Sequence, residues 1–103
     1  MKMYILVRRS IPLGHQVNCV GHATLACYLK FKDHADMPGW LEHSYKKVTC
    51  QVSDEEFELA KNSCEDWAII NESDLNYEPV AIAFRPREKF PEIFKTFKLF
   101  GAT

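Results

Sequence analysis

The chain is poor in the features that mark several large classes of protein. It has 4 glycines in 103 residues, and they form neither a phosphate-binding loop nor a dinucleotide-binding fingerprint. Its 13 lysines and arginines do not outnumber its 14 acidic residues, so it lacks the basic excess typical of proteins that hold a long nucleic-acid duplex. No apolar run approaches the length of a membrane span. These absences indicate a small globular domain in which any functional site is formed by individual side chains rather than by a glycine-rich loop or a large basic surface.

The cysteines indicate a reducing compartment. The 4 cysteines are spread along the chain without CxxC pairs. Cys27, Cys50 and Cys64 lie in apolar patterns typical of buried thiols.

The amino terminus runs directly into a strand pattern rather than a signal peptide. We therefore expect a cytoplasmic protein with no membrane partner, folded as one domain over residues 1–103.

Apolar periodicity predicts an α/β fold. It places strands at 3–7, 47–52, 67–70 and 80–84, long helices at 15–31 and after Ser53, and short helices at 40–45 and 90–94. Alternating strands and helices favour parallel pairing, whereas the turn-rich 71–79 loop is short enough to make the last two strands antiparallel. We predict a single-domain three-layer sandwich with a four-stranded, mixed, mostly parallel sheet and helices on both faces. The tail at 97–100 either adds an edge strand or covers the core.

The first helix carries three reactive side chains on one stripe. His15, Cys19 and His22 fall within an arc of about 60° on a helical wheel. The opposite arc is mainly apolar and is predicted to be buried; it contains Val17, Val20, Thr24, Tyr28 and Phe31. This pattern predicts that the imidazole and thiol groups face the solvent.

Several motifs, in this order, resemble the type 2 peptidyl-tRNA hydrolase family over nearly the whole chain. They are Met3-Tyr4-Ile5-Leu6-Val7-Arg8, Gly21-His22-Ala23-Thr24-Leu25, Trp40-Leu41 before Lys46-Lys47-Val48, and Phe97-Lys98-Leu99-Phe100. The chain departs from the family pattern at His15, where the family has Lys, and at Cys19, where it has Gln. The segment 71–75 stands where the family has Asp-Ala-Gly-x-Thr, and Glu72 or Asp74 replaces its Asp.

The resemblance implies hydrolysis of the ester between a peptide and the 3′ end of tRNA. In that interpretation His22 is the base, Glu72 or Asp74 orients it, and His15 contacts phosphate. A second version makes Cys19 the nucleophile and His22 its base. A third has His15, Cys19 and His22 bind zinc, although the sequence shows no further ligand. In a fourth, His22 only hydrogen-bonds a neighbouring loop.

Basic residues near the strand ends are candidates for nucleic-acid contact. Arg8, Arg9 and Lys47 are the predicted binding residues for a tRNA 3′ end or a nucleotide. The alternative function is a catalytically impaired module of the same fold that binds a tRNA end, a nucleotide or a protein. A third class is a structural or dimerisation domain, and a homodimer is one expected assembly. No cofactor or metal is assigned.

Overall fold

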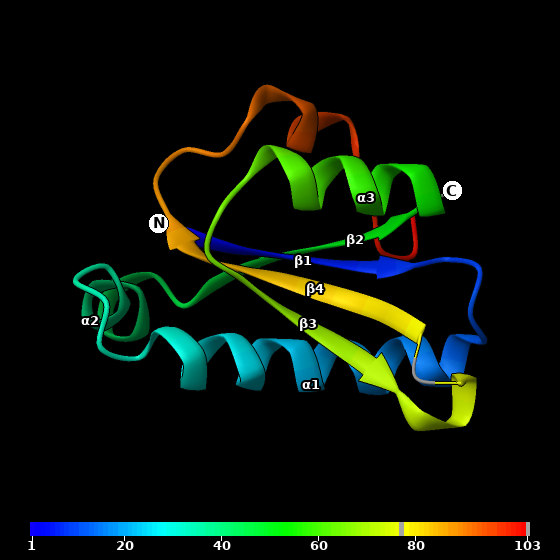
Figure 1. Cartoon of the computed structure of the whole chain (residues 1–103). Coiled ribbons are helices and arrows are strands. Elements are labelled where there is room, and N and C mark those ends of the chain that lie inside the picture. Colours follow the sequence, from blue (N-terminus) through cyan, green and yellow to red (C-terminus); the bar gives the residue numbers. More distant parts are fainter. Residues whose placement is uncertain (77, 103) are drawn as a thin grey trace.

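A computed structural model describes residues 1–76 and 78–102 of the chain (Figure 1). Its strands are β1 (Lys2–Arg8), β2 (Lys46–Val52), β3 (Trp67–Glu72), β4 (Glu78–Arg87) and β5 (Lys98–Leu99). Its α-helices are α1 (Leu13–Phe31), α2 (Met37–Gly39) and α3 (Asp54–Ser63). Three further short helices are η1 (Trp40–Ser44), η2 (Ser73–Leu75) and η3 (Glu92–Thr96). The predicted 71–79 loop includes Tyr77, which lies outside the described residues.

The sheet has five strands in the order β3-β4-β1-β2-β5. The prediction of four strands was wrong because the tail forms β5, which pairs with β2 at Cys50 and Gln51. The prediction of a mostly parallel sheet was also wrong. Only β1 and β2 pair in parallel among the described strands, whereas β4 runs antiparallel to both β1 and β3.

The position of β4 explains this difference. The alternation of strands and helices correctly predicts that β1, β2 and β3 run in one direction. β4 lies between β1 and β3, however, so β3 has no parallel neighbour within the described sheet. The predicted antiparallel pairing of the last two long strands is confirmed, with Ile69 opposite Ile82.

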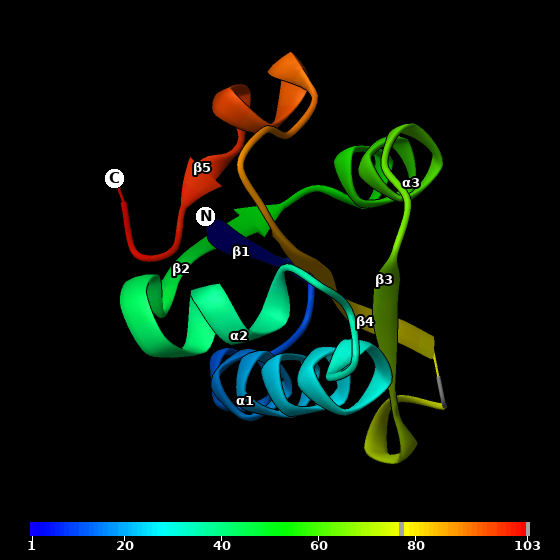
Figure 2. The same ribbon diagram turned by 90° about the vertical axis from the view of Figure 1, so that its left-hand side faces the viewer.

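Side chains of the sheet contribute to two separate hydrophobic cores, one on each face. Alternate residues of β1 point to opposite faces, so Met3 and Ile5 join one core whereas Tyr4 and Leu6 join the other. Figures 1 and 2 show α1 along one face of the sheet and α3 with η3 over the other. The face under α3 is rich in aromatic rings, which include Phe57, Phe84, Phe90, Phe94 and Phe97.

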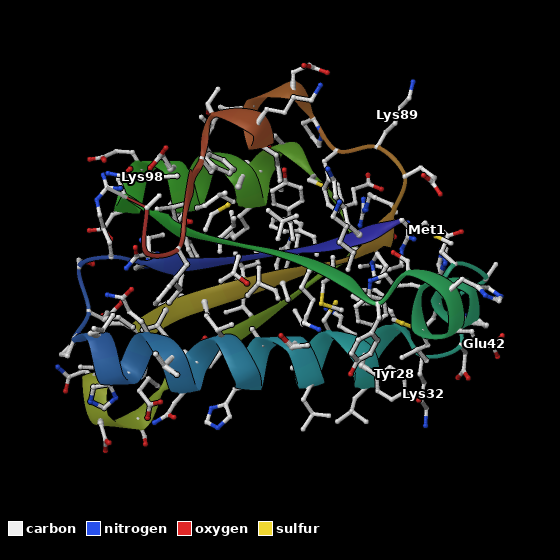
Figure 3. All side chains as sticks on the ribbon, turned by 180° about the vertical axis from the view of Figure 1, so that it is seen from behind. Met1, Tyr28, Lys32, Glu42, Lys89 and Lys98 are labelled. Carbon is white, nitrogen blue, oxygen red and sulfur yellow. The ribbon has the colours of Figure 1, made fainter. Side chains whose placement is uncertain are left out.

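Helix α1 packs through small side chains, and it buries a different stripe from the predicted one. Its buried residues are Gln16, Cys19, Ala23 and Cys27. The facing strands contribute Ala68, Ala81 and Ala83 to the same core, so the helix can approach the sheet closely. Cys19 is therefore buried rather than presented to solvent, while Val17, predicted to be buried, is 58% exposed. Figure 3 shows the helix extending along this whole face.

Local signals define the ends of the helices. The capping box predicted at the start of α3 is present: Glu56 N–H donates to Ser53 Oγ at 3.1 Å, and Ser53 N–H donates to Glu56 Oε1 at 2.8 Å. Helix α1 begins at Leu13, directly after Pro12. Among the described residues, no helix combines the length and apolar character needed to cross a membrane.

Candidate active site

The carboxyl end of β3 and the first turn of α1 bring three ionisable side chains together. One potential ligand atom from each of His15, Glu72 and Asp74 lies within 4.8 Å of the other two. Glu72 ends β3, Asp74 lies in the η2 turn that follows, and His15 faces them from α1. Figure 1 shows this turn beside the start of α1. We call these three residues together with Cys19 the polar cluster.

Glu72 is the centre of the polar cluster. Its Oε1 accepts hydrogen bonds from the backbone N–H of Asp74 at 3.4 Å and from the hydroxyl of Ser73 at 3.5 Å. Its Oε2 accepts one from the thiol of Cys19 at 3.6 Å. The Asp74 N–H is the main cause of a lowered Glu72 pKa; partial burial opposes it, and the Cys19 thiol, His15 and His22 add to it. Glu72 is therefore ionised at neutral pH.

Cys19 acts in this arrangement as a hydrogen-bond donor. Burial, and secondly the neighbouring Glu72 carboxylate, raise the pKa of its thiol to about 11. A cysteine nucleophile reacts as the thiolate, which burial and an adjacent negative charge both disfavour. The geometry therefore supports Cys19 in holding Glu72 and disfavours the nucleophile hypothesis.

His22 lies two turns further along α1 and is exposed. Its charge lies near enough to Glu72 to lower the pKa of that carboxyl, but less than the charge of His15 does. It is His15, and not His22, that lies close to the carboxylates of Glu72 and Asp74. The helical wheel correctly placed the histidines on one stripe, but only the fold shows which of them faces Glu72.

The three predicted basic residues do not converge. Arg8 is held internally: its Nε donates to Pro79 O at 2.7 Å, and its Nη1 donates to Asp54 Oδ1 at 3.1 Å. Arg9 is exposed, and its guanidinium lies 3.8 Å from a Glu56 carboxylate oxygen. Lys47 lies at the opposite end of the sheet, because it pairs in register with Met3 whereas Arg8 pairs with Val52. Arg9 is thus the more exposed of the two arginines at this end of the sheet, and its guanidinium lies beside α3 rather than α1.

The other flank of α1 borders an apolar groove that the sequence did not reveal. This cavity has a volume of about 580 Å³ and lies between α1, η1 and β2. Its lining includes Val20, Leu25, Tyr28, Trp40, Leu41 and Tyr45, with Lys47 as its cation. The rings of Trp40 and Tyr45 stack with centroids 5.1 Å apart, and Lys47 Nζ lies 4.1 Å from the centroid of the Tyr45 ring.

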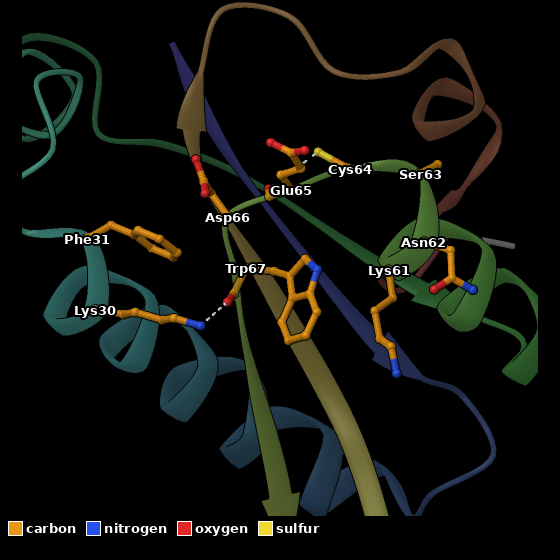
Figure 4. Close-up of a pocket in the computed structure, with 9 residues that line it drawn as sticks. All are labelled: Lys30, Phe31, Lys61, Asn62, Ser63, Cys64, Glu65, Asp66 and Trp67. Carbon is orange, nitrogen blue, oxygen red and sulfur yellow. Dashed lines mark hydrogen bonds between the residues drawn. The ribbon is translucent and has the colours of Figure 1, made fainter.

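A second cavity lies at the start of β3 (Figure 4). Its volume is about 490 Å³, and the ends of α1 and α3 form its walls. Lys30 Nζ donates to the carbonyl oxygen of Trp67 at 2.8 Å across it. Since Trp67 begins β3 and Glu72 ends it, this cavity and the polar cluster lie at opposite ends of the strand.

The order of the elements and the position of the polar cluster are those of an α/β domain with an ionisable site at a strand end. The family model described as Peptidyl-tRNA hydrolase PTH2 matches residues 1–100 of the chain. The chain belongs to this family, as its motifs predicted. Among curated proteins, none matches the chain significantly in sequence.

Proposed function

We propose that the protein hydrolyses the ester that joins a peptide to the 3′ end of tRNA, with the polar cluster as its active site. The observation that supports this most strongly is the grouping of His15 with Glu72 and Asp74 in a member of a peptidyl-tRNA hydrolase family. An imidazole beside an ionised carboxylate is a suitable base for ester hydrolysis. His15 takes the role of base that the sequence suggested for His22.

The proposed reaction begins with a water molecule beside His15. The imidazole takes a proton from this water as its oxygen attacks the ester carbonyl carbon, and a tetrahedral intermediate forms. Glu72 stabilises the resulting imidazolium by its negative charge. Collapse of the intermediate breaks the bond to the ribose 3′ oxygen, and His15 returns the proton to that oxygen. The products are a peptide carboxylic acid and a tRNA with a free 3′ hydroxyl.

The other members of the site position these groups. The thiol of Cys19 and the backbone N–H of Asp74 hold opposite oxygens of Glu72, which fixes the carboxylate beside the imidazole. Arg9, exposed at the end of β1, is a phosphate contact for the tRNA acceptor end. Arg8 supports the fold through Asp54 and Pro79.

The direct test is release of peptide from an N-blocked aminoacyl-tRNA by the purified chain. We expect multiple turnovers, with the N-blocked amino acid and deacylated tRNA as products. His15→Gln should reduce the rate by about 100-fold, because general base catalysis typically contributes that much or more. A matched control is His43→Gln, which changes an exposed histidine beside Glu42 on η1.

The absence of product, even with enzyme in excess over substrate, would contradict hydrolysis. Equal rates for the wild type and His15→Gln would contradict the role of His15 as the base. Salt-sensitive tRNA binding without product would instead support the alternative, a binding module of the same fold. The expected homodimer stays a prediction, which sedimentation of the purified chain tests.

A further inference from the structure

The polar cluster has the composition of a site for a transition-metal ion. We propose that His15, Glu72 and Asp74 bind one zinc ion, and that bound zinc inhibits the proposed hydrolysis. Metal binding itself does not depend on the proposed function; only the inhibition rests on it. The sequence suggested a zinc set of His15, Cys19 and His22 that lacked further ligands, and the fold supplies two carboxylates instead.

The distances between the donor atoms suit a single small ion. The three ligand atoms lie within 4.8 Å of one another. Zinc bonds of about 2.0–2.2 Å in tetrahedral geometry place donor atoms about 3.4 Å apart. A side-chain adjustment of roughly 1 Å closes this difference. Asp74 is exposed and His15 is only partly buried, so both side chains have room to move.

The ligands lie on regular elements and have a supporting contact. They come from the first turn of the 19-residue helix α1, from the last residue of β3, and from the η2 turn that follows it. The buried thiol of Cys19 holds Glu72 Oε2 from the protein side at 3.6 Å. Hydrogen bonds of this kind orient metal-binding carboxylates and strengthen metal affinity.

The donor chemistry favours zinc over magnesium or calcium. Magnesium and calcium prefer shells of six or more oxygen ligands, whereas this site offers one imidazole nitrogen and two carboxylates. Three protein ligands with nitrogen and oxygen donors leave a fourth tetrahedral position for water.

Zinc and hydrolysis compete for the same imidazole. The proposed base needs its nitrogen lone pair for the proton of water, and it needs Glu72 beside it. An ion between His15 and Glu72 takes that lone pair and separates the two groups. Zinc binding should therefore lower the hydrolytic rate, and a chelator should restore it.

The binding test uses the full chain without tRNA, after treatment with EDTA and its removal. Calorimetric titration with zinc, and the absorption spectrum of the cobalt-loaded protein, should both show one site per chain. His15→Gln and Asp74→Asn should each weaken the affinity at least tenfold and remove the cobalt absorption bands. The matched control is again His43→Gln, because it removes an exposed histidine whose imidazole lies 3.8 Å from a Glu42 oxygen. Circular dichroism of each variant establishes that it is folded.

The outcomes separate this proposal from the proposed function. No zinc binding, or the same affinity in His15→Gln and Asp74→Asn as in the wild type, would overturn the metal site whatever the hydrolysis assay shows. Zinc binding that leaves an active enzyme uninhibited would contradict the proposal that zinc and hydrolysis use the same His15 imidazole. Zinc binding lost in both variants, in a protein without hydrolytic activity, would support the metal site and contradict the proposed function.

Discussion

The two flanks of α1 differ in chemistry although one helix provides both. On the flank toward β3 and η2, the helix places His15 and Cys19 against two carboxylates. On the flank toward η1 and β2, it places Val20 and Tyr28 along an apolar groove. The buried small residues between the flanks bring the helix close to the sheet. One helix thus separates a reactive site from an apolar surface.

The polar flank of α1 is suited to catalysis, whereas the apolar flank contributes to the stability of the fold. Ionised Glu72 and its hydrogen bonds make the polar flank suited to proton transfer. The groove has buried Trp40 at its base, so part of its wall also belongs to the core. Changes in the groove should therefore alter stability, whereas changes in the polar cluster should alter hydrolysis.

The largest expected effect on stability is at Trp40, which is 2% exposed. Trp40→Ala should lower the free energy of unfolding by about 3–5 kcal/mol, because it removes a large buried side chain. It also removes the indole N–H that donates to Lys46 O at 2.8 Å. Urea denaturation measures the change. Tyr45→Ala, which removes an exposed ring of the same groove, should lower the free energy of unfolding by clearly less. Equal losses of stability at both positions would contradict the distinction between the buried Trp40 and the exposed Tyr45.

A smaller effect is expected from Cys19→Ser on the polar flank. The hydroxyl of serine can still donate to Glu72, and the thiol of Cys19, with a pKa of about 11, is almost fully protonated at neutral pH. Hydrolysis should therefore stay within a few-fold of the wild-type rate. The measurement is the initial rate on N-blocked aminoacyl-tRNA. A fall of 100-fold or more in a folded variant would restore the thiol nucleophile hypothesis.

The smallest expected effect is a pH-dependent contribution of Glu72 to stability. Its pKa in the folded chain is lowered from 4.5, first by the Asp74 N–H, so the ionised form stabilises the fold. The stability difference between the wild type and Glu72→Gln should be constant above about pH 5. It should shrink as the pH falls below 4.5 through the lowered pKa of the folded chain. Urea denaturation across this range tests the sign; a difference that grows toward acid would contradict it.

Much of the fold follows from local sequence signals. The Ser53 capping box, the alternating pattern at 47–52 and the apolar run at 3–7 each predict an element that the structure contains. The pairing of β4 with β1 was not predictable in this way, because it joins segments that are separated by most of the chain length. The β5 pairing is only two residues long, so its strand signal is weak.

The sequence named the residues of the polar cluster as candidates but did not predict how they are arranged. His15, Cys19, Glu72 and Asp74 were all candidates, and the fold brings them together. The helical wheel gives relative angles but not the side that faces the sheet. That side depends on the alanines of the facing strands, which accept the small stripe of α1 rather than the larger apolar one.

The most direct test compares one change on each flank in the same hydrolysis assay. Glu72→Gln removes the charge beside His15, while Leu25→Ser changes a groove residue that is 58% exposed. With both variants folded, we expect the rate of peptide release to fall about 100-fold for Glu72→Gln and to stay near wild type for Leu25→Ser. Full activity in Glu72→Gln, or a comparable loss in Leu25→Ser, would contradict the assignment of catalysis to the polar cluster.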